Sequence, residues 1–140
     1  MLKIMYALST AVTALIGIAA PGAALAADYE TDYAVAGSLP NEFLTCDTPQ
    51  RGVEVCYDVS GDRWWVRDNS SDGKSAVVDW ENYRGGSLYR KGRCVNSHGV
   101  GTWASCNKNY YEDSVLYGRA GAWDRSAGDN PVFGPWIQFM

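Results

Sequence analysis

The chain contains a single histidine, His98, within the short segment between Cys94 and Cys106. An exposed imidazole titrates near neutral pH and can act as a general acid or base. Phosphodiester cleavage would also need acidic and basic partners, for which the candidates are Glu54, Glu81, Glu112, Arg63 and Arg93. No basic cluster that would hold a phosphate accompanies them, so we favour a solvated loop residue for His98.

Two carboxylates offer a second source of hydrolytic chemistry. Asp79 and Glu81 fall on one face of a predicted strand, and glycoside hydrolysis uses two carboxyl groups held at a fixed separation. We expect Arg63 and Arg67 to lie opposite them across a hairpin, so we favour structural ion pairs over catalysis. The sequence has neither a Gly-x-Ser-x-Gly motif nor a phosphate-binding loop.

A partial match to a calcium loop begins at Asp68, continues to Gly73 and has Asp79 at its twelfth position. Calcium loops of this type end in a bidentate Glu and lead into a helix. Here the twelfth residue is Asp and the following residues alternate as a strand, so we favour an ordinary turn. The CxxC spacing of zinc sites is absent. We therefore expect no metal and no cofactor.

Aromatic residues are abundant, with six Trp and nine Tyr, and a domain of this size cannot bury all of them. Exposed rings stack on sugars and anchor protein interfaces. By alternation Trp65 faces outward; the alternative is that it packs beneath a second sheet or the N-terminal arm, with an arginine over its ring. We expect Trp64, Trp80 and Trp136 in the core. The predicted binding residues are Arg63, Trp65, Arg67, His98, Trp103, Tyr110 and Tyr111.

The N-terminal residues have the pattern of a secretory signal peptide. Lys3 provides a positive charge, residues 5–20 are mostly apolar, and Ala24-Leu25-Ala26 matches the small-x-small site of signal peptidase. A membrane anchor is the alternative, but the apolar stretch is shorter than the roughly 20 residues that a spanning helix needs. We expect cleavage after Ala26, a secreted protein and no transmembrane anchor in the mature chain.

The mature chain, residues 27–140, has the length of one domain. Loss of Lys3 leaves eleven basic against sixteen acidic residues and moves the formal net charge from −4 to −5. This charge disfavours nucleic acid and anionic membranes as partners. Residues 27–45 are acidic and lack regular alternation, so we expect a mobile arm there and a single β domain over residues 46–140.

The mature part contains four cysteines, Cys46, Cys56, Cys94 and Cys106. An even number in an exported chain indicates two disulfides. Three pairings are formally open, and we favour Cys46 with Cys56 and Cys94 with Cys106, because each pair brackets turn-forming residues. Closure of loops of this size stabilises the fold by roughly 3 kcal/mol per bridge in the entropic model.

Residues 62–82 contain two alternating segments on either side of the turn-forming NSSDG. Folding the chain about Ser71 places Trp64 opposite Val78 and Val66 opposite Ala76, which predicts a hairpin in this register. Short strands separated by frequent turns favour an all-β fold, an antiparallel sandwich or small barrel. The other predicted strands are residues 53–58, 87–91, 102–107, 114–119 and 132–139.

Three segments carry a resemblance: GDRWWVRD at 61–68, SDGKSAVVDW at 71–80, and the loop pattern C-x-N-x-x-G-x-G-T-W-x-x-C at 94–106. Over residues 46–140 the chain resembles a group of small secreted actinobacterial proteins with four cysteines. The resemblance implies an exported β protein and brings no established active site.

These observations favour a secreted, non-enzymatic binding module for an extracellular protein or carbohydrate. We expect contact through exposed aromatics and through the loop between Cys94 and Cys106, which loses little entropy on binding. One alternative is a small secreted hydrolase, similar to a ribonuclease or a glycosidase, that uses His98 or a carboxylate pair. Another is a surface-associated structural protein that self-assembles. The sequence leaves the oligomeric state open.

Overall fold

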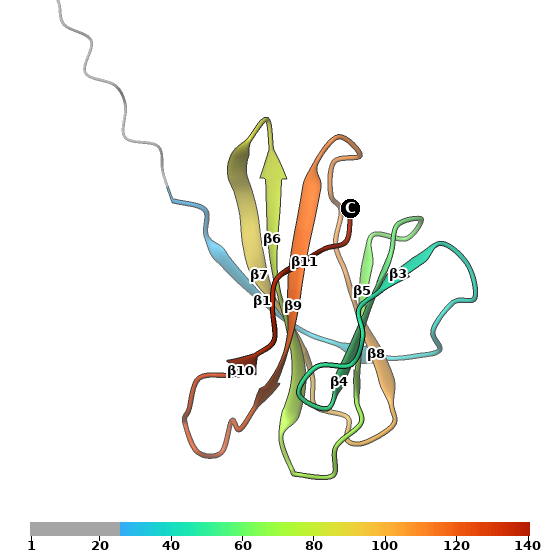
Figure 1. Ribbon diagram of the computed structural model, residues 1–140, viewed down its shortest axis with the longest axis vertical. Coiled ribbons are helices and arrows are strands. Elements are labelled where there is room, and N and C mark those ends of the chain that lie inside the picture. The colour runs from blue at the N-terminus through green and yellow to red at the C-terminus, as the bar shows by residue number, and fades with distance from the viewer. Residues whose placement is uncertain (1–25) are drawn as a thin grey trace, which may run out of the picture.

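The computed structural model describes residues 26–140. The predicted signal peptide therefore lies outside the described residues, apart from Ala26. Over the described range, no helix has the length and apolarity needed to cross a membrane. The predicted all-β fold is confirmed: two β-sheets pack face to face as a sandwich (Figure 1).

Sheet A has six strands in the order β1-β7-β6-β9-β10, and β11 pairs with the same strand, β9. All its pairs are antiparallel except the parallel pair of β1 with β7. Its strands are β1 (Tyr29–Tyr33), β6 (Ser75–Arg84), β7 (Ser87–Asn96), β9 (Val115–Trp123), β10 (Val132–Phe133) and β11 (Ile137–Gln138).

Sheet B has five strands in the order β2-β8-β5-β4-β3 and is antiparallel throughout. Its strands are β2 (Val35–Ala36), β3 (Leu44–Cys46), β4 (Val53–Asp58), β5 (Arg63–Asp68) and β8 (Trp103–Asn107).

The predicted hairpin is wrong, although both of its strands exist. β5 pairs with β4 and β8 in sheet B, whereas β6 pairs with β7 and β9 in sheet A. Alternation shows which face of a strand is buried but not which strand lies beside it. Trp64 and Val78 lie in one core, as expected. However, they reach it from opposite sheets and not from neighbouring strands.

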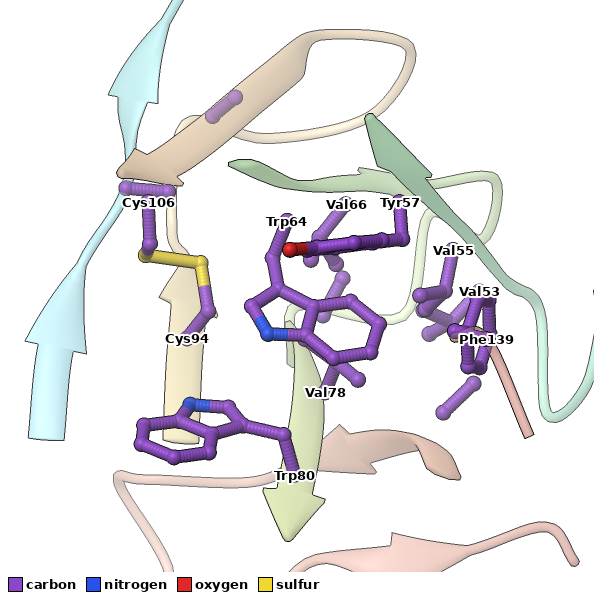
Figure 2. Packing of buried hydrophobic residues seen from close by; sticks show 14 of the residues in the cluster. Val53, Val55, Tyr57, Trp64, Val66, Val78, Trp80, Cys94, Cys106 and Phe139 are labelled. Carbon is purple, nitrogen blue, oxygen red and sulfur yellow. A yellow bond between two sulfur atoms is a disulfide. The ribbon is translucent and has the colours of Figure 1, made fainter. Parts of the chain in front are cut away.

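The core lies between the sheets and is built around aromatic side chains (Figure 2). Trp64 and Trp80 are 0% and 1% exposed. The Trp64 indole N–H donates to the Tyr110 hydroxyl at 3.0 Å, and the Trp80 and Tyr110 rings lie 5.3 Å apart between centroids. Phe139, near the C-terminus, meets Trp64 edge to face at 4.9 Å. One buried tyrosine therefore connects the large side chains of the two sheets.

Glycines on sheet A make room for these rings. A Cβ atom at Gly118 would lie 2.7 Å from the Trp64 ring, and one at Gly92 would lie 2.7 Å from the Trp80 ring and 2.3 Å from the Glu30 carbonyl oxygen. The Trp64 ring can therefore pack against β9 of sheet A, and the Trp80 ring can lie over the neighbouring strand β7, only because these two positions carry no side chain.

We expected a mobile arm at residues 27–45, but residues 29–36 form strands in both sheets. β1 pairs with β7, and after Ala34 the chain crosses to sheet B, where β2 pairs with β8 (Figure 1). Glu30 accepts hydrogen bonds from Arg90 at 2.8 Å and from Lys108 at 2.7 Å. The acidic residues that suggested a solvated arm are instead partners of basic side chains on the folded domain.

Both predicted disulfides are confirmed. Cys46–Cys56 joins neighbouring strands of sheet B, and Cys94–Cys106 joins β7 of sheet A to β8 of sheet B. Cys94 and Cys106 are 0% and 4% exposed, and their bridge lies in the core near Trp64 (Figure 2). The second disulfide therefore holds the two sheets together.

The Glu30 ion pairs predict acid sensitivity. The hydrogen bond from Arg90, together with Lys108 and against the effect of burial, lowers the pKa of Glu30 from 4.5 to about 2. A carboxyl group whose pKa is lower in the folded than in the unfolded state stabilises the fold at pH values above its unfolded pKa. This stabilisation is lost as the pH falls from about 4.5 toward 2. We expect Glu30→Gln to lower the free energy of unfolding at pH 7 and to flatten its fall over this range, as measured by urea denaturation.

Glu42→Gln, at an exposed position, is the matched control and should follow the wild-type pH profile. An unchanged profile in Glu30→Gln would show that these ion pairs do not stabilise the docked β1 strand.

Candidate functional site

The predicted residues Arg63, Trp65 and Arg67 share the outer face of sheet B, as their alternation indicated. Trp65, however, is only 5% exposed, because the chain at Gly37 lies against its ring: a Cβ atom there would be 3.2 Å from the ring. Arg67 is ion-paired with Glu54, to which its Nε donates at 2.6 Å. Trp65 therefore follows the alternative considered above, in which the N-terminal segment covers it.

The other predicted aromatics separate into three environments. Trp103 is half-buried, and the Arg67 guanidinium lies 4.8 Å from its ring centroid. Tyr110 was expected at the surface but is 4% exposed, since its ring and hydroxyl pack against the core tryptophans. Tyr111 is 46% exposed, and the Arg84 guanidinium stacks 3.5 Å from its centroid. The predicted binding residues thus do not form one surface.

His98 connects two segments of the chain. Its Nε2 lies 2.7 Å from the Ala34 carbonyl oxygen, where the chain passes from β1 to β2. Its backbone N–H donates to Asn96 Oδ1 at 3.0 Å. Over residues 26–140, no Glu or Asp is hydrogen-bonded to the imidazole, so the structure gives His98 a positioning contact and no acid or base partner.

The first and last residues of the calcium-loop match, Asp68 and Asp79, lie on different sheets. Asp68 Oδ1 accepts the backbone N–H of Ser70 at 2.8 Å, as in an ordinary turn, and Asp79 lies on the outer face of sheet A. Within the described part of the chain, no group of three or more His, Cys, Asp or Glu side chains is placed to hold a metal ion.

Asp79 is the centre of a charged network on that outer face, with a side chain 8% exposed. It accepts hydrogen bonds from Arg93 at 2.5 Å, from the Tyr29 hydroxyl at 2.9 Å and from Arg119 at 3.4 Å. Burial, followed by the charge of Asp79, raises the pKa of the Tyr29 hydroxyl. The expected partners Arg63 and Arg67 are on the other sheet, so this part of the ion-pair prediction is corrected.

Rings and guanidinium groups alternate around this network, in a set that we call the aromatic row. Arg93 lies 5.0 Å from the Trp123 centroid, and Arg119 lies 4.0 Å from the Phe133 centroid and 4.5 Å from that of Trp136. The full row consists of Tyr33, Arg125, Trp123, Arg93, Phe133, Arg119 and Trp136.

The row covers part of the sheet. Val77 and Val95 are 0% exposed, yet they do not belong to the core between the sheets. They alternate with inward-facing residues of β6 and β7, so they are buried on the outer side. The aromatic row therefore serves as a thin second layer on the outside of sheet A.

Beside Trp136 the same face is hollowed into a groove of about 520 Å³. Its aromatic lining is Tyr83 on β6, Tyr117 on β9 and Trp136 in the link between β10 and β11. We call this the sheet A groove. Two carboxylates also line it, Glu81 and Asp113, together with Val115 and the turn glycines Gly85 and Gly86.

The groove combines exposed ring surface with hydrogen-bond acceptors. Trp136 is 39% exposed and has Arg119 against it. The rings of Tyr83 and Tyr117 meet at right angles, 5.9 Å apart. The Tyr83 hydroxyl donates to Glu81 at 2.7 Å, and this hydrogen bond raises the pKa of Tyr83. Such a surface can stack on an apolar face and accept hydrogen bonds from hydroxyl groups around it.

Sequence reasoning missed this groove. Trp136 was assigned to the core, which is wrong, since it is 39% exposed on the outer face. Glu81 was considered as a catalytic carboxylate and as a partner of arginines across a hairpin, but not as part of a groove with aromatic rings. Continued alternation along β6 from Asp79 would have placed Glu81 and Tyr83 on one face, but nothing in the sequence shows that Tyr117 and Trp136 join them.

Comparison of the chain with protein-family models, with curated proteins and with solved structures gives no match. The site must therefore be interpreted from its own geometry.

The Asp79 network predicts a large loss of stability on disruption. In Asp79→Ala the two guanidinium groups lose their shared carboxylate on a mostly buried surface, and removal of one partner of a buried ion pair costs about 3–5 kcal/mol. We expect a loss toward this range in the free energy of unfolding, measured with urea. Asp113→Ala, whose side chain is 71% exposed and paired with Arg84, should change stability little. Equal losses in the two variants would contradict the role of Asp79.

Proposed function

We propose that the protein is an exported, non-enzymatic binding module and that the sheet A groove binds a neutral glycan. Export is supported by the signal-peptide pattern of the sequence and by the two disulfides. The disulfides in addition suit a small domain that must remain folded outside the cytoplasm.

The observation that carries the glycan proposal is the environment of Trp136. The ring lines the groove with Tyr83 and Tyr117 and has the guanidinium of Arg119 4.5 Å from its centroid. A ring held in this way loses little freedom when a sugar stacks on it. Tyr83 and Tyr117 project from strands of sheet A, so their rings also lose little freedom on binding.

The charges of the groove favour a neutral sugar. Glu81 and Asp113 can accept hydrogen bonds from sugar hydroxyls. They repel sulfate and carboxylate groups, as does the excess of acidic residues in the whole chain. A hydrolytic role for these two carboxylates is less well supported, because Glu81 is engaged by Tyr83 and Asp113 pairs with Arg84 at 3.3 Å.

A panel of neutral oligosaccharides built from glucose, mannose, galactose or N-acetylglucosamine tests the proposal by isothermal titration calorimetry. We expect at least one to bind, and Trp136→Ala to weaken it at least tenfold, or about 1.4 kcal/mol. Tyr33→Ala is the control, since Tyr33 belongs to the aromatic row but does not line the groove.

Four results would contradict this function. No heat with any sugar, or equal loss in both variants, would exclude the groove as the glycan site. Release of shortened sugars from the panel would indicate a hydrolase. A mass that rises with protein concentration in light scattering would favour self-assembly.

A further inference from the structure

A second cleft, of about 560 Å³, lies on the outer face of sheet B, on the opposite side of the sandwich from the sheet A groove. Residues 35–38 and Pro40 line it together with Asp58, Arg63, Trp65, Ser105 and Asn107. This volume is within the range of about 300–1,000 Å³ that is usual for small-molecule sites.

The topology of sheet B explains why a cleft exists here. β2 and β3 lie at opposite edges of the sheet, so residues 37–43 must span four strand spacings of about 4.8 Å each. The cyan link runs on the side of sheet B that faces away from sheet A before it enters β3 (Figure 1). One wall of the cleft is thus a crossing segment of chain, and the sheet itself is its floor.

Trp65 in this floor has an unsatisfied polar atom. The residue is 5% exposed, and its buried indole N–H has no hydrogen-bond acceptor within residues 26–140. Because Trp65 lines the cleft, its indole N–H signal can report a ligand bound there.

The cleft also carries two opposite charges, Asp58 on β4 and Arg63 directly opposite it on β5. Asp58 is 7% exposed, and its Oδ1 accepts hydrogen bonds from Ser60 N at 3.0 Å, Ser60 Oγ at 2.7 Å and Gly61 N at 3.2 Å. Nothing in the described part of the chain donates to its Oδ2. Arg63 is exposed and, over the same range, forms neither an ion pair nor a hydrogen bond. A carboxylate and a guanidinium therefore line one cleft without a mutual salt bridge.

We propose that this cleft binds a small zwitterion with an apolar side chain, of the amino acid or short peptide class. Arg63 suits the ligand carboxylate, because a guanidinium binds such a group through two parallel hydrogen bonds. Asp58 suits the ammonium group, and Asn107 and Ser105 on β8, the strand on the other side of β5, provide neutral donors and acceptors. Val35 and Pro40 offer apolar surface to the side chain. This inference is independent of the glycan proposal.

The test follows the indole N–H signals of the protein in ¹H–¹⁵N spectra, with the Trp65 signal assigned from Trp65→Phe. The probes are L-leucine, L-leucinamide, which lacks the carboxylate, and N-acetyl-L-leucine, which lacks the ammonium group. We expect L-leucine to shift the Trp65 signal, and each analogue to bind at least tenfold more weakly. L-Leucyl-L-leucine in parallel shows whether a free amino acid or a peptide is preferred.

Arg63→Gln tests whether Arg63 binds the ligand carboxylate, and we expect it to fold as the wild type because Arg63 is exposed. It should reduce the affinity for L-leucine to that for L-leucinamide and leave binding of L-leucinamide unchanged. Trp136→Ala, on the other sheet, should bind L-leucine as the wild type does. The proposal is overturned by the absence of any Trp65 shift up to about 10 mM ligand, where even very weak binding is visible, by equal affinity for all three probes, or by full binding in Arg63→Gln.

Discussion

Trp64 and Trp80 project into one core from opposite sheets, and Tyr110 contacts both of them. Much of the remaining structure accommodates this arrangement. Gly92 and Gly118 leave space for the two rings, and the disulfide between Cys94 and Cys106 connects the sheets beside them. A small domain has a limited interior, and here three large aromatic side chains occupy a considerable part of it.

Apart from Tyr57 and Phe139, which also pack in this core, most aromatic residues lie outside it, and the two outer faces use them differently. On sheet B the crossing segment at Gly37 covers Trp65. On sheet A, rings alternate with arginines around Asp79 and end at Trp136, where the groove begins. The same ion pairs that make the outer layer rigid therefore also position the ring on which the proposed glycan stacks.

Local patterns predicted the disulfides and most of the strands from β4 onward, but neither β1, β2 and β3 nor the neighbours of each strand. The alternation at Trp64 and at Val78 correctly indicated their buried faces, since an alternating pattern is a property of one strand alone. It could not show that the two strands belong to different sheets, because inward-facing residues look the same whether they meet across a sandwich or along a hairpin. The disulfide pairing was easier to predict than the strand neighbours, because a short segment rich in turn-forming residues brings its own two ends together.

The candidate sites were largely beyond sequence analysis for a related reason. Tyr110 lies in a polar segment, and only its contact with two distant tryptophans explains its burial. Trp136 follows a proline near the C-terminus, and only the pairing of β10 and β11 with one strand places it beside Arg119. Similarly, the acidic residues of β1 suggested a solvated arm until their partners Arg90 and Lys108 were known.

The central claim is that the sheet A groove, and no other surface, binds the glycan. The most direct measurement is a map of backbone ¹H–¹⁵N chemical-shift changes on titration with the neutral oligosaccharide that binds most tightly. The account predicts that the largest changes lie at Glu81, Tyr83, Tyr117 and Trp136. Changes centred on the loop between Cys94 and Cys106, or on the outer face of sheet B, would contradict it.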